Sequence, residues 1–344
     1  MIIGLLSILF MGIPFWFVGW QINLSTGENR FTLPFMMSVC LALVGFLLWL
    51  VRKKYQQVLL ISLLVGLSAG QQFRDANSYR LIHEEETTFL QQFLWRAGDL
   101  KTGTVILINE FPTNFSSDTV LMSMINWIYD KNPSQKLKVG LFYLNDKRIG
   151  HQIPALEKGL DVVYGIRVMR FQGSTSHSLV AYYQKPGCLK IIDPENNYYS
   201  GVLPKIVQQA SFLSNLSQIN IQAGNNALPE EQFKFKPKED WCYYYERAEF
   251  MNQTQQWQEV VKLGKEAERK GYKPAYTYEY FPFIYGYLMN DDWVEALALS
   301  KKIQRTYPIL NTNICTLWKK TTQNKASSGA QSAYLTAMDL LDCE

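Results

Sequence analysis

The sequence opens with the apolar run MIIGLLSILFMGIPFWFVGW at residues 1–20, which carries no charged side chain. A second apolar run, PFMMSVCLALVGFLLWLV, covers residues 34–51, and a third, with a shorter apolar core, covers residues 55–72. An α-helix rises ~1.5 Å per residue, so about 20 residues cross a hydrocarbon layer ~30 Å thick. Residues 1–71 are therefore predicted to be a membrane block of about three transmembrane helices in contact with the lipid bilayer.

Basic residues give the predicted orientation of this block. Arg52, Lys53 and Lys54 follow the second apolar run directly, and short basic loops are retained in the cytoplasm. If the third run crosses the membrane, the chain after residue 71 is exterior; if it does not cross, that part is cytoplasmic. We predict a multi-pass protein of the bacterial cytoplasmic membrane with a large extracytoplasmic C-terminal domain. The uncharged start leaves open whether further helices precede Met1 in a longer protein.

The charge of the remaining chain argues against nucleic-acid binding. The whole sequence of 344 residues has a formal net charge of +4. Most of that excess comes from the membrane block, where Arg30, Arg52, Lys53 and Lys54 outnumber Glu28. The rest is close to neutral, whereas a nucleic-acid-binding domain normally carries a basic patch.

Cysteine usage allows disulfides but does not indicate a metal site. One of five cysteines lies in the second apolar run, and the other four are Cys188, Cys242, Cys315 and Cys343. Four cysteines in an exported domain allow three disulfide pairings, and unpaired buried thiols are the alternative. No Cys-x-x-Cys or Cys/His spacing points to zinc, so we predict no metal and no cofactor.

Residues 72–200 are predicted to form an exterior α/β domain. The run TVILI at residues 104–108 is typical of a strand buried on both faces. Ser117 or Asp118 can cap a helix that runs to about residue 129. Further strands are predicted at 138–144 and 162–171, and a hairpin at 178–184 and 188–192. This order favours a small α/β unit with an antiparallel edge.

The C-terminal part shows a helical repeat. After a helix and connector at residues 201–239, residues 240–344 contain two helix–turn–helix units, in which Trp257 and Trp293 are 36 residues apart. Such a period resembles that of tetratricopeptide repeats. Aromatic side chains crowd both units, and they serve either as repeat core or as anchors for a partner. The predicted partner-binding residues are Trp241, Tyr244, Tyr280 and Trp293.

The strongest catalytic candidates are His177 and Asp193. A strand that begins at a histidine and a hairpin that ends in Asp-Pro resemble the second half of papain-like and transglutaminase-like sites, in which the histidine is the base and the aspartate orients it. The nucleophile is missing, because the only cysteine before His177 is Cys40 in the membrane block. A loop histidine beside a turn-forming Asp-Pro is the alternative reading.

Several segments together resemble the C-terminal portion of uncharacterised bacterial multi-pass membrane proteins. They are Gly12–Trp16, Arg30–Pro34, Trp95–Ala97, Cys188–Pro194 and Trp241–Tyr244. This resemblance implies a membrane block with an exported domain and no particular activity. The layout is also similar to that of membrane glycosyltransferases that use lipid-linked sugars, whose key acidic residue lies in an early exterior loop, where this chain offers Glu28.

Two hypotheses about function follow. The first is a non-enzymatic, membrane-anchored protein of the cell envelope whose exterior α/β and helical-repeat domains bind a protein partner or assemble into a complex. The alternative is a membrane glycosyltransferase-like protein with a lipid-linked sugar donor, or the C-terminal part of one, for which carbohydrate is the expected ligand. The missing catalytic set favours the first hypothesis.

Overall fold

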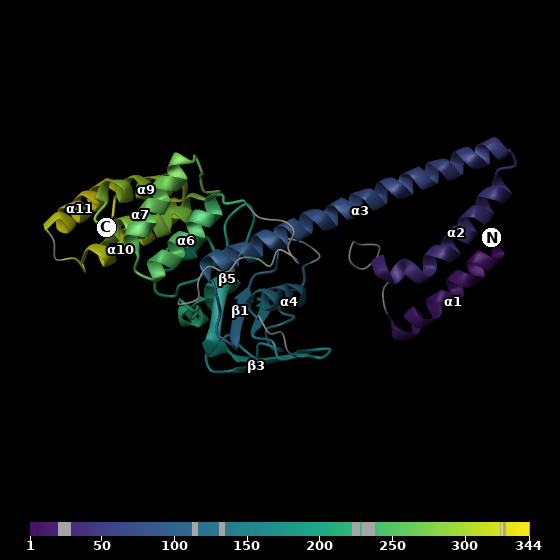
Figure 1. Cartoon of the computed structure of the whole chain (residues 1–344), viewed down its shortest axis with the longest axis horizontal. Coiled ribbons are helices and arrows are strands. Elements are labelled where there is room, and N and C mark those ends of the chain that lie inside the picture. The colour runs from purple at the N-terminus through teal and green to yellow at the C-terminus, as the bar shows by residue number, and fades with distance from the viewer. Residues whose placement is uncertain are drawn as a thin grey trace. The chain divides into compact units, whose positions relative to one another are not determined.

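A computed structural model describes residues 1–19, 29–111, 116–130, 135–221, 228, 238–323, 325 and 328–343. The chain divides into two units, Met1–His83 and Glu84–Glu344. Their elements are labelled in Figure 1.

The first unit is helical and presents apolar side chains on its surface. Its elements are α1 (Ile2–Val18), α2 (Leu33–Leu50) and the first part of α3 (Lys54–Arg96). Helices α1 and α2 approach closely at Gly4, where a Cβ would overlap the backbone of Ala42. Met37 is 75% exposed. Apolar helix surfaces of this kind need a lipid or protein environment.

Within the described residues, one helix is long and apolar enough to cross a membrane. This is α2, whereas α1 is a shorter apolar helix of 17 residues. The sequence predicted about three membrane helices, and the structure supports one of them, α2. The predicted third helix does not end at residue 72. It continues to Arg96 as a 43-residue helix, since no glycine or proline interrupts residues 71–96.

The second unit contains the predicted α/β region. Its main sheet consists of β1 (Thr104–Ile108), β2 (Val139–Tyr143), β5 (Ser178–Tyr182) and β6 (Lys190–Ile191), in the order β2-β1-β5-β6. The first three strands are parallel, and β6 is an antiparallel edge strand. Helix α4 (Asp118–Tyr129) connects β1 to β2, and its N-cap Ser117 accepts a hydrogen bond from the amide of Val120. Asn126 of α4 bonds both backbone groups of Val139, which fixes the helix to β2.

The strand predicted at 162–171 is instead a hairpin. It forms a separate two-stranded sheet from β3 (Asp161–Ile166) and β4 (Met169–Ser174). The chain reverses at Arg167, which has a φ of +52°. A non-glycine residue in this left-handed region is uncommon, so the sequence carried no turn signal.

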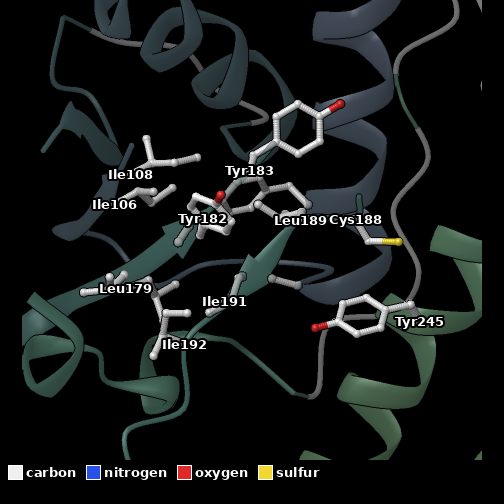
Figure 2. Close-up of a cluster of buried hydrophobic side chains, with 14 of the residues drawn as sticks. Ile106, Ile108, Leu179, Tyr182, Tyr183, Cys188, Leu189, Ile191, Ile192 and Tyr245 are labelled. Carbon is white, nitrogen blue, oxygen red and sulfur yellow. The ribbon is translucent and has the colours of Figure 1, made fainter. Parts of the chain in front are cut away.

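The last turns of α3 pack against the sheet and complete its core. Phe89, Leu90, Phe93 and Leu94 of this helix are buried. Figure 2 shows the core beneath them, where side chains of β1, β5 and β6 meet. Phe89 lies against Tyr183 at a ring-centroid distance of 5.2 Å. The helix thereby covers the region where β5 turns into β6.

The C-terminal region is helical, as predicted. Short helix α5 (Lys205–Ala210) follows Pro204. After it, consecutive helices pack in pairs: α6 (Trp241–Gln253) with α7 (Trp257–Arg269), α8 (Phe281–Met289) with α9 (Trp293–Thr306), and α10 (Asn311–Gln323) with α11 (Ser328–Leu340). The described residues therefore form three helical hairpins where two repeat units were expected. Helices α7 and α8 pack closely because Gly286 faces the buried side chain of Val260, which a Cβ would overlap.

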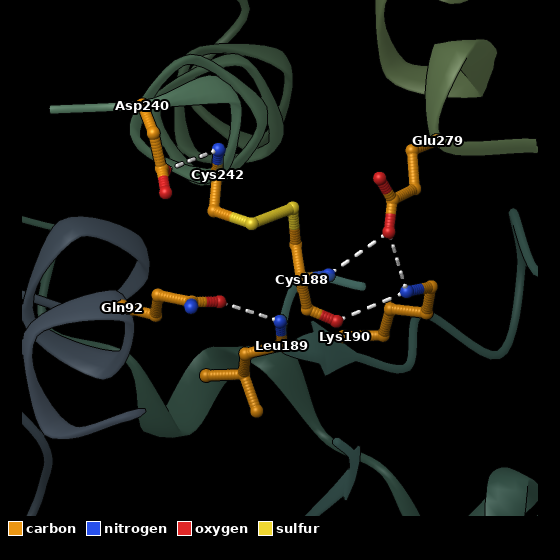
Figure 3. Close-up of a disulfide and its surroundings, with 7 residues drawn as sticks. All are labelled: Gln92, Cys188, Leu189, Lys190, Asp240, Cys242 and Glu279. Atoms are coloured by element: carbon orange, nitrogen blue, oxygen red, sulfur yellow. Dashed lines mark hydrogen bonds and ion pairs between the residues drawn. A yellow bond between two sulfur atoms is a disulfide. The ribbon is translucent and has the colours of Figure 1, made fainter. Parts of the chain in front are cut away.

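The sheet and the helical hairpins belong to the same unit. A disulfide between Cys188, in the turn before β6, and Cys242, in the first turn of α6, joins them (Figure 3). A second disulfide, Cys315–Cys343, ties α10 to the residues after α11. Cys40 is the free cysteine among the described residues. Part of the predicted connector, residues 222–227 and 229–237, lies outside the described residues.

Candidate functional site

The structure brings His177 and Asp193 to the same end of β5 but does not couple them. His177 is the exposed last residue of a 3-10 turn, η2 (Thr175–His177), directly before β5. The antiparallel register of β6 on β5 returns Asp193 to that end. The Asp193 carboxylate accepts hydrogen bonds from the Glu195 amide at 2.9 Å and from Asn196 at 2.7 Å. Asp193 is thus a turn-forming residue here, and no hydrogen bond joins it to His177 in the described structure.

No cysteine of the described chain is placed to act as a nucleophile with this pair. Cys188 is buried and bonded to Cys242, and Cys40 lies on α2 in the other unit. The papain-like arrangement is therefore not formed by the described residues. Glu28, the acidic residue considered for sugar transfer, lies outside them.

The four predicted partner-binding aromatics fall into different environments. Trp241 is 7% exposed and Tyr244 is 0% exposed, whereas Tyr280 and Trp293 are half-buried. The Tyr244 hydroxyl donates to Glu266 at 3.1 Å and accepts from Lys270 at 2.8 Å. Tyr244 is therefore a core residue that ties α6 to α7, and it offers no surface to a partner.

Trp241 and Tyr280 do meet, at a groove between the helical hairpins. The groove encloses about 180 Å³ and is lined by aromatic side chains of α6, of α8 and of the segment between α7 and α8, and by other residues of α7 and α9. The Trp241 ring lies 5.3 Å from Tyr280 and 5.2 Å from Phe283, measured between ring centroids. We call this the aromatic groove; its aromatic lining is Trp241, Tyr272, Tyr280, Phe283 and Tyr287. Trp293 is not part of the lining.

The rim of the aromatic groove carries charges of both signs. Glu268, Lys273, Glu295 and Lys302 line it and are exposed. The Lys302 ammonium sits 5.2 Å from the centre of the Tyr280 ring, an arrangement in which the ring quadrupole attracts the cation. The groove thus combines an aromatic floor with a balanced, solvated rim.

A second, larger pocket of about 460 Å³ lies where the sheet region meets the helical hairpins. We call it the polar pocket. Its charged lining is Arg96 from the end of α3, Asp193 and Glu195 after β6, and Glu249 on α6. Arg96 is 1% exposed, and its Nη1 donates to Gln253 Oε1 at 2.7 Å.

Burial raises the pKa of the Glu249 carboxyl to about 7; the negative charge of Asp193 adds to this increase, and the positive charge of Arg96 opposes it. A carboxyl with this pKa exchanges its proton near neutral pH. The polar pocket thus holds one group that can be either a donor or an acceptor of hydrogen bonds.

Buried charges also hold the turn between β5 and β6 (Figure 3). Lys190 and Glu279, both fully buried, form an ion pair with an N–O distance of 3.3 Å. Glu279 also accepts a hydrogen bond from the Cys188 amide at 2.9 Å, and the Lys190 ammonium faces the ring of Tyr278 at 5.0 Å. From the other side, Gln92 of α3 accepts from the Leu189 amide at 2.7 Å. Every contact is internal, so we assign this cluster a structural role.

The described residues and the comparisons with known proteins give no direct indication of function. Among the described residues, no group of three or more His, Cys, Asp or Glu side chains could hold a metal ion. No protein-family model matches the sequence. No curated protein and no solved structure matches it either.

The polar pocket was missed by sequence reasoning. Asp193, a predicted catalytic candidate, does line it, but nothing in the sequence links Asp193 to Arg96 and Glu249, which are far away in the chain. The one available signal was a pair of carboxylates, Glu246 and Glu249, on an aromatic-rich helix. Glu246 is fully buried, and burial raises the pKa of its carboxyl well above the usual value. An acidic residue on a helix face that is otherwise apolar is therefore the sequence pattern that could have indicated this site.

Proposed function

We propose that this chain is a membrane-anchored protein of the cell envelope whose helical region binds a protein partner through the aromatic groove. The observation that carries the proposal is the aromatic groove itself: an open, aromatic depression with charges of both signs around it. Interface hot spots are of this kind, with buried aromatic anchors inside a polar rim.

The size of the groove favours one inserted side chain. Its volume of about 180 Å³ is close to the ~150 Å³ cavity that holds benzene in an engineered protein. The proposed occupant is a peptide segment of the partner that inserts one aromatic or aliphatic side chain. Acidic and basic residues flanking that anchor would pair with Lys302 and Glu295, which gives specificity more than affinity.

The two disulfides support an extracytoplasmic location for the second unit. Disulfides persist in oxidising compartments and are rare in the cytosol, and four of the five cysteines are paired. In the proposed topology α1, α2 and the first part of α3 all cross the membrane, with Arg52–Lys54 on the cytoplasmic side. Only α2 among the described helices is long and apolar enough to cross a membrane by itself, so the crossing of α1 and α3 is part of the proposal.

Thiol labelling of whole cells tests the location. A membrane-impermeant maleimide should label no cysteine of the second unit before reduction and should label all four after mild reduction and unfolding. Free thiols at Cys188 or Cys315 in protein made by its native host would contradict an exterior location.

Co-purification tests the partner. The protein is extracted from native membranes in mild detergent, and the proteins that remain after salt washes are identified by mass spectrometry. Ala298→Arg places a long side chain in the groove from an exposed position on α9 and should reduce the retained partner about tenfold or more, equivalent to 1.4 kcal/mol.

Thr316→Arg is the matched control for that experiment, because Thr316 is also exposed on a helix, α10, but lies outside the groove. This variant should retain the partner. Equal retention by the two variants would refute binding at the aromatic groove. The glycosyltransferase alternative stays a prediction, because its acidic residue is not among those described.

A further inference from the structure

We infer that the polar pocket is a carbohydrate-binding site for a neutral or amino sugar. It shares no lining residue with the aromatic groove, so this inference does not depend on the proposed partner binding.

Three residues that line the pocket carry buried polar atoms with no hydrogen-bond partner among the described residues. Arg96 Nε, Asn252 Oδ1 and Trp257 Nε1 are buried and have no hydrogen-bond partner, and all three residues line the pocket. Arg96 is almost completely buried, and its guanidinium uses Nη1 on Gln253. Buried polar atoms in folded proteins are nearly always hydrogen-bonded, and a ligand or ordered water in the pocket could supply the missing bonds.

The mixture of donors and acceptors favours hydroxyl groups. Arg96 and Trp257 can only donate, whereas the Asn252 oxygen and the Asp193 carboxylate accept. A hydroxyl does both, so a polyhydroxylated ligand can satisfy neighbouring donors and acceptors at once. Glu249, with a pKa near neutral pH, can bond a hydroxyl in either protonation state.

Aromatic side chains supply the other half of sugar recognition. Trp257, Phe281 and Tyr285 line the same pocket, and such rings combine a flat apolar face with a large contact area. A pyranose ring presents C–H groups on its faces and hydroxyls at its edge. The pocket volume of about 460 Å³ lies in the range of ~300–1,000 Å³ that is common for small-molecule sites.

The charge of the lining disfavours acidic ligands. Within the lining, Asp193, Glu195 and the partly ionised Glu249 oppose the positive charge of Arg96, while the Lys320 ammonium contacts the lining residue Asn196 at 3.2 Å. Phosphate, sulfate or a uronic acid would therefore meet a net negative lining, and like charges at short range disfavour binding. A neutral hexose is accepted, and the ammonium group of an amino sugar adds an attraction to the carboxylates.

Saturation-transfer NMR on the full chain in lipid nanodiscs tests this. The preparation must avoid detergents with sugar headgroups, such as maltosides, because they would occupy the pocket. The probes are glucose, glucosamine and glucuronate. We expect glucosamine and glucose to bind with dissociation constants in the millimolar range, glucosamine more tightly, and glucuronate to bind more weakly than glucose.

Two variants locate the site. Trp257→Ala should weaken glucose binding about tenfold. Trp293→Ala is the control, since Trp293 begins α9 as Trp257 begins α7 but does not line the pocket. Glu249→Gln keeps the shape of the side chain and should reduce the preference for glucosamine over glucose.

Three results would overturn the inference. They are the absence of saturation transfer from every sugar, glucuronate as the best ligand, and equal losses in the Trp257 and Trp293 variants. The first would leave ordered water as the partner of the three unpartnered atoms. The second would disprove the charge argument, and the third would place sugar binding outside the polar pocket.

Discussion

Removal of the Cys188–Cys242 disulfide gives the sharpest test of how the second unit is held together. The double variant Cys188→Ala/Cys242→Ala deletes the covalent link between the sheet and α6. Alanine is preferred to serine because both sites are buried, where an unbonded hydroxyl would add a separate cost.

The expected loss follows from the length of the closed loop. The two cysteines are 54 residues apart, and the chain-entropy model then gives a stabilisation of about 4 kcal/mol at 25 °C. For a domain of this size, each kcal/mol shifts the unfolding midpoint by about 2–4 °C. The variant should therefore unfold roughly 8–16 °C below the wild type, with the upper value as a limit.

Thermal unfolding of the full chain in nanodiscs, followed by circular dichroism at one scan rate, measures this shift. The variant Cys315→Ala/Cys343→Ala opens a shorter loop of 28 residues and should lose slightly less, about 3.5 kcal/mol. A Cys188→Ala/Cys242→Ala variant that unfolds at the wild-type temperature would refute the reasoning, because the link would then constrain nothing.

Three further predictions concern stability. The raised pKa of Glu249, about 7 against an ordinary 4.5, means that the folded state keeps a proton that the unfolded chain releases. The contribution of Glu249 to the free energy of unfolding in urea should therefore fall by up to roughly 3 kcal/mol between pH 4.5 and pH 7 and stay constant above pH 7. Glu249→Gln should make the pH dependence shallower, with the rest coming from Glu246, whose pKa burial also raises. Lys190→Met should cost about 3–5 kcal/mol by leaving Glu279 buried without its counter-charge, and an added Glu279→Gln should restore part of the loss; no recovery would contradict the ion-pair argument. Gly286→Ala should cost about 1–3 kcal/mol through overlap with α7, whereas Gly329→Ala, which meets open space, should not; equal effects would disprove the close packing.

The strands of the main sheet and α4 were predictable because their signals are local. Four of the five residues at 104–108 are apolar since β1 is buried on both faces, and Ser117, one of the two predicted caps, caps α4. The reversal at Arg167 was not predictable, because it uses neither glycine nor proline. The continuity of the third apolar run with the helical stretch after it, which makes α3 43 residues long, was also missed, since hydropathy marks where an apolar segment ends and not where its helix ends.

The candidate sites show the same limit. Trp241 and Tyr280 were named from aromatic crowding and do line the groove, yet Tyr244 is wholly buried. A helix that is aromatic on several sides gives no periodicity that separates core from surface. The polar pocket depends on residues from α3, the segment after β6, and α6, and nothing in one sequence shows that these segments meet.

The disulfide and the buried carboxylate that hold the turn between β5 and β6 have a consequence for how the protein is made. Cys188 is synthesised 54 residues before its disulfide partner. Its backbone amide bonds to the carboxylate of Glu279, which is 91 residues further along the chain. If the second unit is exported as proposed, this thiol emerges before its partner, and with four cysteines two wrong pairings compete with the native one. A producing cell must therefore delay or correct oxidation by thiol–disulfide exchange. A host without an isomerase in that compartment should accumulate mispaired protein.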